Sequence, residues 1–269
     1  MFAACYENSN EPGLGHDLLA VLAHYELPYV LVASEVCCGM PKLELGDLAS
    51  VEALKNVNIP VLAPLARAGY AILTTVPSCT LMFKQELPLL FPEDADVRAV
   101  AEAMLDPFES LVARERDGLL DRSFKRGLGK VSYHIPCHLR VQNVGQKTRE
   151  VLEWIPDTSI NTVERCSGHN GTWGVKREFF ADAMKIGEPV FRRLEEFEPD
   201  YLSSDCPIAV RGIEEGIAQG DGGSKARTAQ RLALLRPVYG TDVPAYGAEW
   251  ARAPPRSPQT LREYANGAH

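Results

Sequence analysis

The sequence predicts an α/β protein of two tandem similar domains, each a small, mostly parallel sheet flanked by helices. Two observations carry this prediction. Short apolar runs of β-type residues alternate with segments of helical periodicity, a pattern typical of parallel sheets. The cysteines recur with similar spacing in both halves, which indicates an internal repeat of roughly 130 residues. We therefore expect domains at 1–125 and 126–240, the second degenerate, and a weakly ordered Pro- and Ala-rich tail at 241–269.

The elements of the first half follow from apolar runs and helical spacing. We expect strands at 1–5, 28–33 and 70–76, and helices at 16–25, 48–57, 59–68 and 97–116. Leu18, Leu19 and Leu22 share one face of the first helix, and Pro107 interrupts the last one. Residues 117–129 form the expected linker.

The second half repeats this alternation. We expect strands at 131–134, 159–163 and 200–203, and helices at 148–154 and 178–196. In each half the strands run into loops that carry cysteines. Because ligand sites of open α/β sheets lie beyond the carboxyl ends of the strands, the loops of one half should meet at one edge.

Composition excludes several classes of function. With 45% apolar and 24% charged residues, the chain has the composition of a soluble globular protein. A net charge of -8 argues against nucleic acid as a partner, since phosphate binding needs a basic surface. The sequence has no apolar run long enough to span a bilayer and no signal peptide, so we expect a cytoplasmic protein. Seven cysteines in such a chain favour metal or redox chemistry over disulfides.

The cysteines form two sets with similar internal distances. The first is Cys5, Cys37, Cys38 and Cys79, and the second is Cys137, Cys166 and Cys206. Ser167 stands in the second set where the first has the second cysteine of its doublet. The repeated feature is therefore a ligand set.

The doublet Cys37-Cys38 is followed by Gly39 and Pro41. Successive side chains of a strand point to opposite faces, so two thiols at one site require a bent backbone, which Gly39 permits. This arrangement can aim two thiolates at one polynuclear centre. The alternative is a pair of small apolar residues in a core.

Four thiolates can hold an iron–sulfur cluster or zinc. The sequence lacks both the paired Cys-x-x-Cys of common zinc sites and the Cys-x2-Cys-x2-Cys-x3-Cys run of ferredoxins. Adjacent cysteines favour a multi-iron centre, because neighbouring sulfurs can bind different irons. Zinc and free thiols remain the alternatives.

The second set has three thiolates, which can hold a cluster with one open iron or a metal completed by a histidine. His134, His138 and His169 lie beside the ligand segments. His138 follows Cys137 directly and is the best additional ligand or proton carrier, given the near-neutral pKa of imidazole. We take His138 and His169 as candidate catalytic residues, with a structural, hydrogen-bonded role as the alternative for each.

Glycines punctuate the loops that carry the cysteines. Gly168, Gly171 and Gly174 follow a predicted strand, but their spacing is not that of a dinucleotide fingerprint. We expect Gly39, Gly168 and Gly171 to contribute to cofactor binding, with loop amides donating to cluster sulfur or to an anion. An ordinary tight loop is the alternative.

These motifs resemble a known family. The pattern Cys…Cys-Cys-Gly…Pro-Ser-Cys, followed by Pro-Cys-His…Cys-Ser-Gly-His-Asn-Gly-Thr-Trp-Gly…Ser-Asp-Cys-Pro, is similar to the tandem cysteine-rich (CCG) domains of heterodisulfide reductase B subunits. It is closer still to the C subunits of anaerobic glycerol-3-phosphate dehydrogenases. The resemblance covers roughly residues 3–215 and implies two α/β domains whose cysteines hold iron–sulfur clusters.

The sequence also departs from the family pattern. Full CCG sites end in Cys-x-x-Cys, whereas Met82 follows Cys79 at that spacing and Ser203 precedes Cys206. The type of cluster is therefore open in both halves. The ferredoxin-type domain that often precedes these repeats is absent from the sequence. We therefore expect a trimmed subunit, or one whose partner supplies the rest of the electron-transfer path.

The resemblance implies an iron–sulfur electron-transfer subunit of an oxidoreductase. Its partners would be flavoprotein or ferredoxin-type subunits, and its acceptor a quinone or a disulfide. Proteins of this kind can be peripheral on the inner face of the membrane through a membrane-anchored partner. The alternatives are a zinc- or thiol-based interaction module without redox activity, and a second site that binds a small substrate beside His138 and His169.

Overall fold

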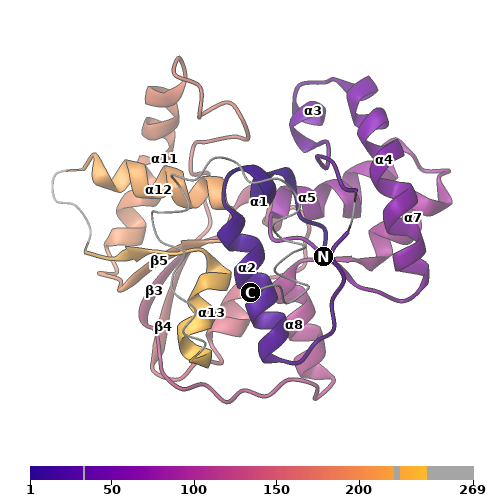
Figure 1. Ribbon diagram of the computed structural model, residues 1–269. Helices are drawn as coiled ribbons and strands as arrows, with labels where there is room; N and C mark the ends of the chain where they lie inside the picture. The colour runs from indigo at the N-terminus through magenta and orange to yellow at the C-terminus, as the bar shows by residue number, and fades with distance from the viewer. Residues whose placement is uncertain (33, 221–224, 241–269) are drawn as a thin grey trace. The chain divides into compact units, whose positions relative to one another are not determined.

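The computed structural model describes residues 1–32, 34–220 and 225–240. The chain forms two compact units, Met1–Pro107 and, within the described residues, 108–240, and each is considered by itself (Figure 1). Both units combine helices with parallel strands, which confirms the predicted fold class. The two units divide after Pro107, before the predicted domain boundary at residue 125. That boundary, as a limit of the repeat, stays a prediction. The predicted tail, 241–269, lies outside the described residues.

The first unit is mainly helical. Its helices are α1 (Cys5–Ser9), α2 (Pro12–His24), α3 (Met40–Glu44), α4 (Leu48–Arg67), α5 (Pro77–Leu81), the π-helix η1 (Met82–Glu86), α6 (Leu87–Leu90) and α7 (Ala95–Ala103). The strands β1 (Ile72–Leu73) and β2 (Met104–Leu105) pair in parallel. The expected long helix at 97–116 is therefore divided, because β2 separates α7 from α8 (Pro107–Arg116).

Helix α4 is longer than the two helices expected at 48–57 and 59–68. The Asp47 side chain accepts a hydrogen bond from the Ser50 backbone N–H and caps its first turn. The helix then continues through Pro60 and Pro64. Burial of Ile59 and Leu62 explains why the prolines do not end it, since tertiary packing outweighs local propensity.

The first two expected strands are extended segments that are tied by few hydrogen bonds. Phe2 N donates to Leu73 O at 2.9 Å, and Val32 N donates to Met1 O at 3.1 Å. These contacts place the N-terminal segment between the segment ending at Val32 and β1. The third expected strand, 70–76, is reduced to β1. Ala33, at the end of the second, lies outside the described residues.

The second unit contains a more regular sheet. Its helices after α8 are α9 (Cys137–Arg140), α10 (Lys147–Leu152), α11 (Phe180–Glu195), α12 (Pro207–Ala218) and α13 (Arg231–Tyr239). Its strands are β3 (Gly129–His134), β4 (Thr158–Val163), β5 (Tyr201–Ser204) and β6 (Arg227–Thr228). They pair in parallel in the order β4-β3-β5-β6 among the described residues.

Helices α11 and α12 pack together against this sheet (Figure 1). Their apolar faces bury Val190, Phe191 and Ile213 against Leu202 of β5. A second cluster, centred on Tyr133, packs with Ile135 and Leu139. The β-type strands are thus covered by apolar side chains, which is typical of a parallel sheet.

The internal repeat is visible in the order of neighbouring segments. In the second unit, β3 lies between β4 and β5, with β6 beside β5. In the first unit, the N-terminal segment lies between residues near 32 and β1, with β2 beside β1. Segments at corresponding places in the two halves therefore have the same neighbours, which agrees with a duplicated fold.

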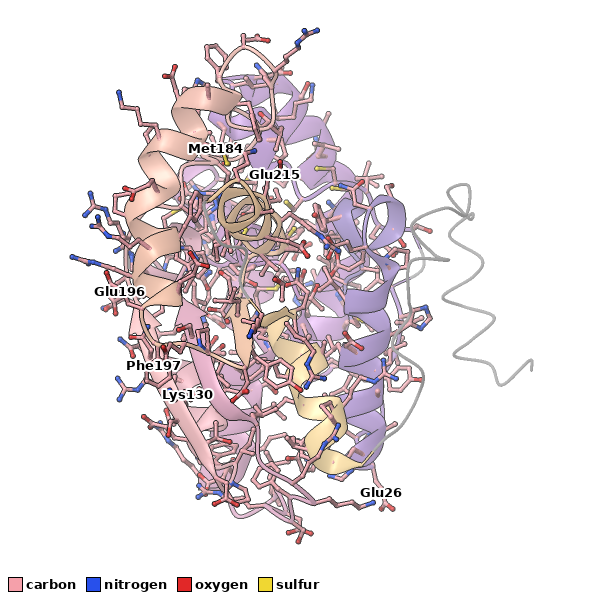
Figure 2. The ribbon with its side chains drawn as sticks, turned by 90° about the vertical axis from the view of Figure 1, so that its left-hand side faces the viewer. Glu26, Lys130, Met184, Glu196, Phe197 and Glu215 are labelled. Carbon is pink, nitrogen blue, oxygen red and sulfur yellow. The ribbon has the colours of Figure 1, made fainter. Side chains whose placement is uncertain are left out.

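The predicted linker belongs to the second unit. Phe124 stacks on Tyr239 of α13 with ring centroids 5.7 Å apart, and Lys125 N donates to Val238 O. At the start of β3, the Lys130 ammonium lies 5.5 Å from the centroid of the Phe197 ring (Figure 2). The contacts of Phe124 and Lys125 hold the linker before the sheet begins, and that of Lys130 holds the start of β3.

Candidate metal centre

The first cysteine set comes from three separate segments of the first unit. Cys5 begins α1, the doublet lies just before α3, and Cys79 lies in α5. Each lies after one of the three segments joined by backbone hydrogen bonds, the N-terminal segment, the segment ending at Val32 and β1. Cys38 and Cys79 are buried in the apolar core, whereas Cys5 is exposed and Cys37 is half-buried.

The four sulfur atoms of this set form a continuous chain of contacts. The Cys5 thiol donates to Cys37 Sγ at 3.8 Å. Cys38 is hydrogen-bonded to both Cys37 and Cys79 through their side chains. The structure therefore brings together all four residues that the sequence assigned to the first set.

Hydrogen bonds between these thiols give them different pKa values. Hydrogen bonds from Cys38 and Cys5 lower the pKa of the Cys37 thiol. The same contacts, together with burial, raise the pKa of Cys5 and of Cys38. Cys37 thus becomes a thiolate before Cys5 and Cys38, and the thiolate is the form that binds metals.

Gly39 supports the doublet through its backbone. Its φ of 99° lies in the left-handed region, which glycine adopts without strain. Its N–H group donates to Cys37 and contributes to the lowered pKa of that thiol. A Cβ atom at this position would lie 3.4 Å from Met82 Cε, so the turn is also closely packed.

Asn58 is a site residue that sequence reasoning missed. Its side chain, 1% exposed, projects from α4 and binds the backbone before and at the doublet. Asn58 Oδ1 accepts from Val36 N at 3.0 Å, and Nδ2 donates to Val36 O at 3.3 Å and to Cys37 O at 3.1 Å. A polar residue between Val57 and Ile59 was the available signal.

A carboxyl group is buried near the same loops. Glu7, fully buried two residues after Cys5, accepts a hydrogen bond from the Thr75 hydroxyl. Burial raises the pKa of Glu7 above its ordinary value. The contact joins α1 to the loop after β1.

The second cysteine set occupies corresponding places in the second unit. Cys137 begins α9, Cys166 follows β4, and Cys206 immediately precedes α12. Cys137 and Cys166 are exposed and Cys206 is buried. Burial raises the pKa of Cys206 to about 12, and the nearby Cys137 adds to the shift. Burial raises the pKa of Cys137, and the charge of Cys166 adds to the shift.

Gly168 repeats the role of Gly39. Its N–H group donates to Cys166 Sγ at 3.4 Å, and its φ is 90°. A Cβ atom at Gly168 would lie 2.0 Å from Ala183 O, so the loop rests against α11 without room for a side chain. Gly171 also has a positive φ, of 57°. The cofactor-binding role of the three glycines stays a prediction.

His169 lies at the second set and contacts one of its thiols. Its Nε2 atom is 3.8 Å from Cys206 Sγ, and its Nδ1 atom is 3.0 Å from the hydroxyl of Ser167. Burial lowers the pKa of His169 to about 4, with smaller effects from His134 and His138. The ring is therefore neutral at pH 7. The catalytic roles of His138 and His169 stay predictions.

His134 has a structural position. Its Nδ1 is 3.0 Å from Ser204 Oγ and its Nε2 is 2.8 Å from Arg165 O. Ser204 is two residues before Cys206, and Arg165 immediately precedes Cys166. His134 therefore joins the two loops that carry these cysteines, as Asn58 fixes the doublet of the first unit.

A buried polar network stands beside Cys206. Asp205 accepts hydrogen bonds from Tyr133 and Thr148 and forms an ion pair with Arg231. The Arg231 guanidinium also lies 4.9 Å from the centroid of the Phe108 ring. This network fixes the end of β5 to β3, α10 and α13.

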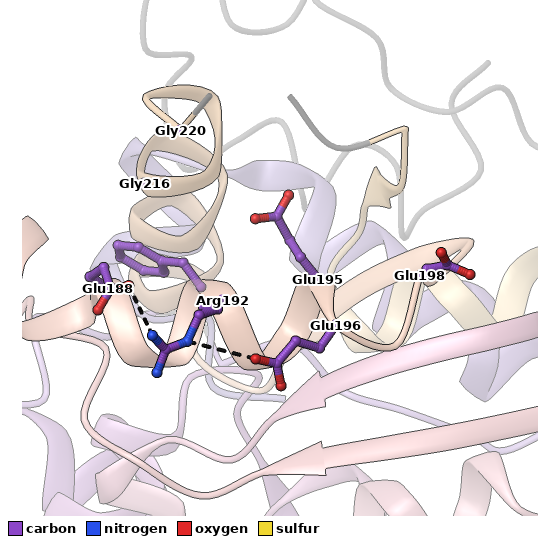
Figure 3. Close-up of a pocket in the computed structure, with 8 residues that line it drawn as sticks. Glu188, Arg192, Glu195, Glu196, Glu198, Gly216 and Gly220 are labelled. Carbon is purple, nitrogen blue, oxygen red and sulfur yellow. Dashed lines mark ion pairs between the residues drawn. The ribbon is translucent and has the colours of Figure 1, made fainter. Parts of the chain in front are cut away.

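Within the described residues, no group of three or more His, Cys, Asp or Glu side chains has an arrangement that could hold a single metal ion. A pocket of about 440 Å³ between α11 and α12 is lined by Phe191, four glutamates, Arg192 and two glycines (Figure 3). Arg192 forms ion pairs with Glu188 and Glu196. Because neither cysteine nor histidine lines it, this pocket is not the candidate centre.

Comparison with known proteins identifies the family. The sequence profile of CCG, described as a cysteine-rich domain, matches residues 1–84 and 131–208. The chain belongs to the CCG cysteine-rich domain family. The two matches coincide with the two cysteine sets and confirm the predicted tandem repeat.

The relatives of this CCG protein include components of oxidoreductases. The C subunit of the anaerobic glycerol-3-phosphate dehydrogenase of Escherichia coli K12 is 31% identical over 79% of this chain and 54% of its own length. The B subunit of a fumarate reductase (CoM/CoB) of Methanothermobacter marburgensis is 26% identical over 90% and 46%. An uncharacterised iron–sulfur protein of Methanocaldococcus jannaschii is 25% identical over 80% and 41%. The chain thus spans about half the length of these relatives or less.

Likeness to solved structures adds nothing to this assignment. A solved solute-binding protein of an ABC transporter system from Conexibacter woesei covers 86% of this chain and 71% of its own, but its TM-score of 0.30 and 15% identity carry no argument. In the part of the chain that the structure describes, no helix has the length and apolar character needed to cross a membrane.

Proposed function

We propose that this protein is an iron–sulfur electron-transfer subunit of an oxidoreductase complex. The observation that carries the proposal is the series of contacts among four cysteine side chains from three separate segments, Cys5, Cys37, Cys38 and Cys79. Support also comes from its relatives, two of which are oxidoreductase subunits and one an iron–sulfur protein by name.

The donor set of the first unit fits an iron–sulfur cluster. Clusters are held by cysteine thiolates that bind different irons, so the geometry of a single-ion site is not required. Two of the four sulfurs are buried in apolar surroundings, and burial is one determinant of cluster potential. The Gly39 N–H group donates to Cys37, and such hydrogen bonds to sulfur also tune the potential.

The cluster, when bound, supplies one-electron transfer. The protein's own residues would position and insulate it. Asn58 fixes the backbone that presents the doublet, and Met82 packs against the Gly39 turn. The exposed edge at Cys5 is the side from which a partner could exchange electrons.

The partners and acceptor form the finer part of the proposal. We propose a flavoprotein or ferredoxin-type subunit as the electron donor or acceptor on one side, and a quinone or a disulfide on the other. A membrane association would then come through a membrane-anchored partner. The chain's similarity to one component of a glycerol-3-phosphate dehydrogenase favours a complex of this kind.

The proposal is tested by anaerobic purification and redox titration. A protein with about four irons and a similar amount of acid-labile sulfide at the first site is expected to bleach on reduction by dithionite and to recover with a quinone. Zinc without labile sulfide would instead support the alternative function, a zinc-based interaction module without redox activity. A folded, colourless protein without iron would contradict the proposal.

A further inference from the structure

The two halves differ at the second position of the doublet. The first half has Cys37-Cys38-Gly39, and the second has Cys166-Ser167-Gly168. Both glycines donate a backbone hydrogen bond to the cysteine two residues earlier. The loops are therefore equivalent, and Ser167 occupies the place of Cys38.

A contact made by Cys38 in the first unit has a counterpart in the second. Cys38 is hydrogen-bonded to Cys79, the last cysteine of its set. In the second unit the last cysteine is Cys206, and the atom that contacts its sulfur at 3.8 Å is His169 Nε2. In the second unit an imidazole nitrogen therefore contacts the last cysteine, as the Cys38 thiol does in the first unit.

Ser167 helps to aim this imidazole. Its side chain is buried, and its hydroxyl lies 3.0 Å from His169 Nδ1. With the proton on Nδ1, the ring donates to Ser167 and its Nε2 lone pair faces the Cys206 thiol. Histidines that bind metals almost always have their other ring nitrogen hydrogen-bonded in this way.

The other nearby histidines differ from His169. Both ring nitrogens of His134 are engaged, by Ser204 and by the Arg165 carbonyl, so this ring offers no atom to a metal. His138 is half-buried beside Cys137. The imidazole that contacts the buried thiol of the set is that of His169.

We infer that His169 is the fourth ligand of a second iron–sulfur centre, together with Cys137, Cys166 and Cys206, and that Ser167 positions it. The inference rests on the proposed function and deepens it. The second half would then carry a centre with a mixed ligand set. Imidazole in place of thiolate raises the potential of an iron–sulfur centre, so the two centres would differ in potential.

The test is pulsed EPR of the full chain, purified anaerobically and reduced. The wild type should show the hyperfine coupling of a nitrogen bound to iron, and 15N-labelled histidine should change that coupling. His169→Ala and Cys206→Ser should abolish it, whereas the matched neighbour variant His138→Ala should retain it. Ser167→Ala should weaken the coupling, because the His169 imidazole then loses the hydroxyl that orients it.

A second variant keeps the test independent of folding. His169→Cys restores a thiolate, so it should retain the iron of the second centre, lose the nitrogen coupling and lower the midpoint potential of that centre. A wild-type spectrum without bound nitrogen, coupling that disappears only in His138→Ala, or zinc in the second set would overturn the inference. If these results came with an intact first cluster, the proposed function would stand, whereas a chain without any iron would fail both.

Discussion

The Asp205 carboxylate and the Arg231 guanidinium form an ion pair at 2.7 Å in which the two side chains are 0% and 3% exposed. Thr148 hydrogen-bonds to both partners. Asp205 immediately precedes Cys206, so the pair that stabilises the second unit also fixes the position of this thiol. Breaking a buried pair leaves an uncompensated charge in a low-dielectric interior.

Asp205→Ala is therefore expected to lower the free energy of unfolding by roughly 3–5 kcal/mol. The matched control is the exposed pair of Arg211 and Glu214, at 2.9 Å. Glu214→Ala should cost less than about 1 kcal/mol, since water already solvates both groups. Urea unfolding followed by circular dichroism measures both. Equal effects of the two substitutions would refute the structural role of the buried pair.

Asn58→Ala should release the backbone of the doublet. Three hydrogen bonds to residues 36 and 37 are lost, which should cost roughly 2 kcal/mol and lower the iron content of the first site. Asn56 is an exposed residue on the same helix, so Asn56→Ala is the control. Iron assay and thermal unfolding distinguish the two variants. Unchanged iron in Asn58→Ala would show that the doublet holds its shape without this side chain.

His134 should make the second unit sensitive to acid. Burial lowers the pKa of His134 from its ordinary 6.5 to about 4. Between these pH values the unfolded chain binds a proton that the folded chain does not. The free energy of unfolding is therefore undiminished by this group above pH 6.5, and it falls as the pH falls toward 4. The loss amounts to roughly 3 kcal/mol.

His134→Gln removes this titration. Although the variant should be less stable at pH 7 because one hydrogen bond is lost, its stability should change less between pH 6.5 and 4. Urea unfolding across this range provides the measurement. A wild type and a variant with parallel pH profiles would assign the acid sensitivity to other groups.

Gly168→Ala should be much more costly than a substitution at another glycine with positive φ. At Gly168 the new Cβ would lie 2.0 Å from Ala183 O, whereas Gly46, with φ 73°, has no neighbouring atom within 4 Å. Gly46→Ala should cost about 1–2 kcal/mol from backbone strain alone, and Gly168→Ala several kcal/mol. Thermal unfolding compares the two. Similar costs would mean that the loop can move away from α11.

The sequence was sufficient to predict the fold class and the tandem repeat, whereas the two cysteine ligand sets stay predictions. These features rest on spacing and on local periodicity, which survive without knowledge of tertiary contacts. The grouping of Cys5 with Cys79 followed from one rule, that loops after parallel strands meet at one edge.

The supporting residues could not be predicted in the same way. Asn58 acts on residues 22 positions earlier, and His134 joins segments 31 and 70 positions later. Contacts of this kind depend on how helices and strands pack, which no local pattern encodes. For the same reason, α4 continues through Pro60 and Pro64, where local propensity predicts a break.

The central claim is that the four sulfurs of the first unit hold one iron–sulfur cluster. Iron and acid-labile sulfide are therefore best counted in the anaerobic wild type and in Cys38→Ser, which removes the thiol linking Cys37 to Cys79. We predict loss of about four irons with the matching sulfide in a variant that remains folded. Equal iron and sulfide in both proteins would contradict it.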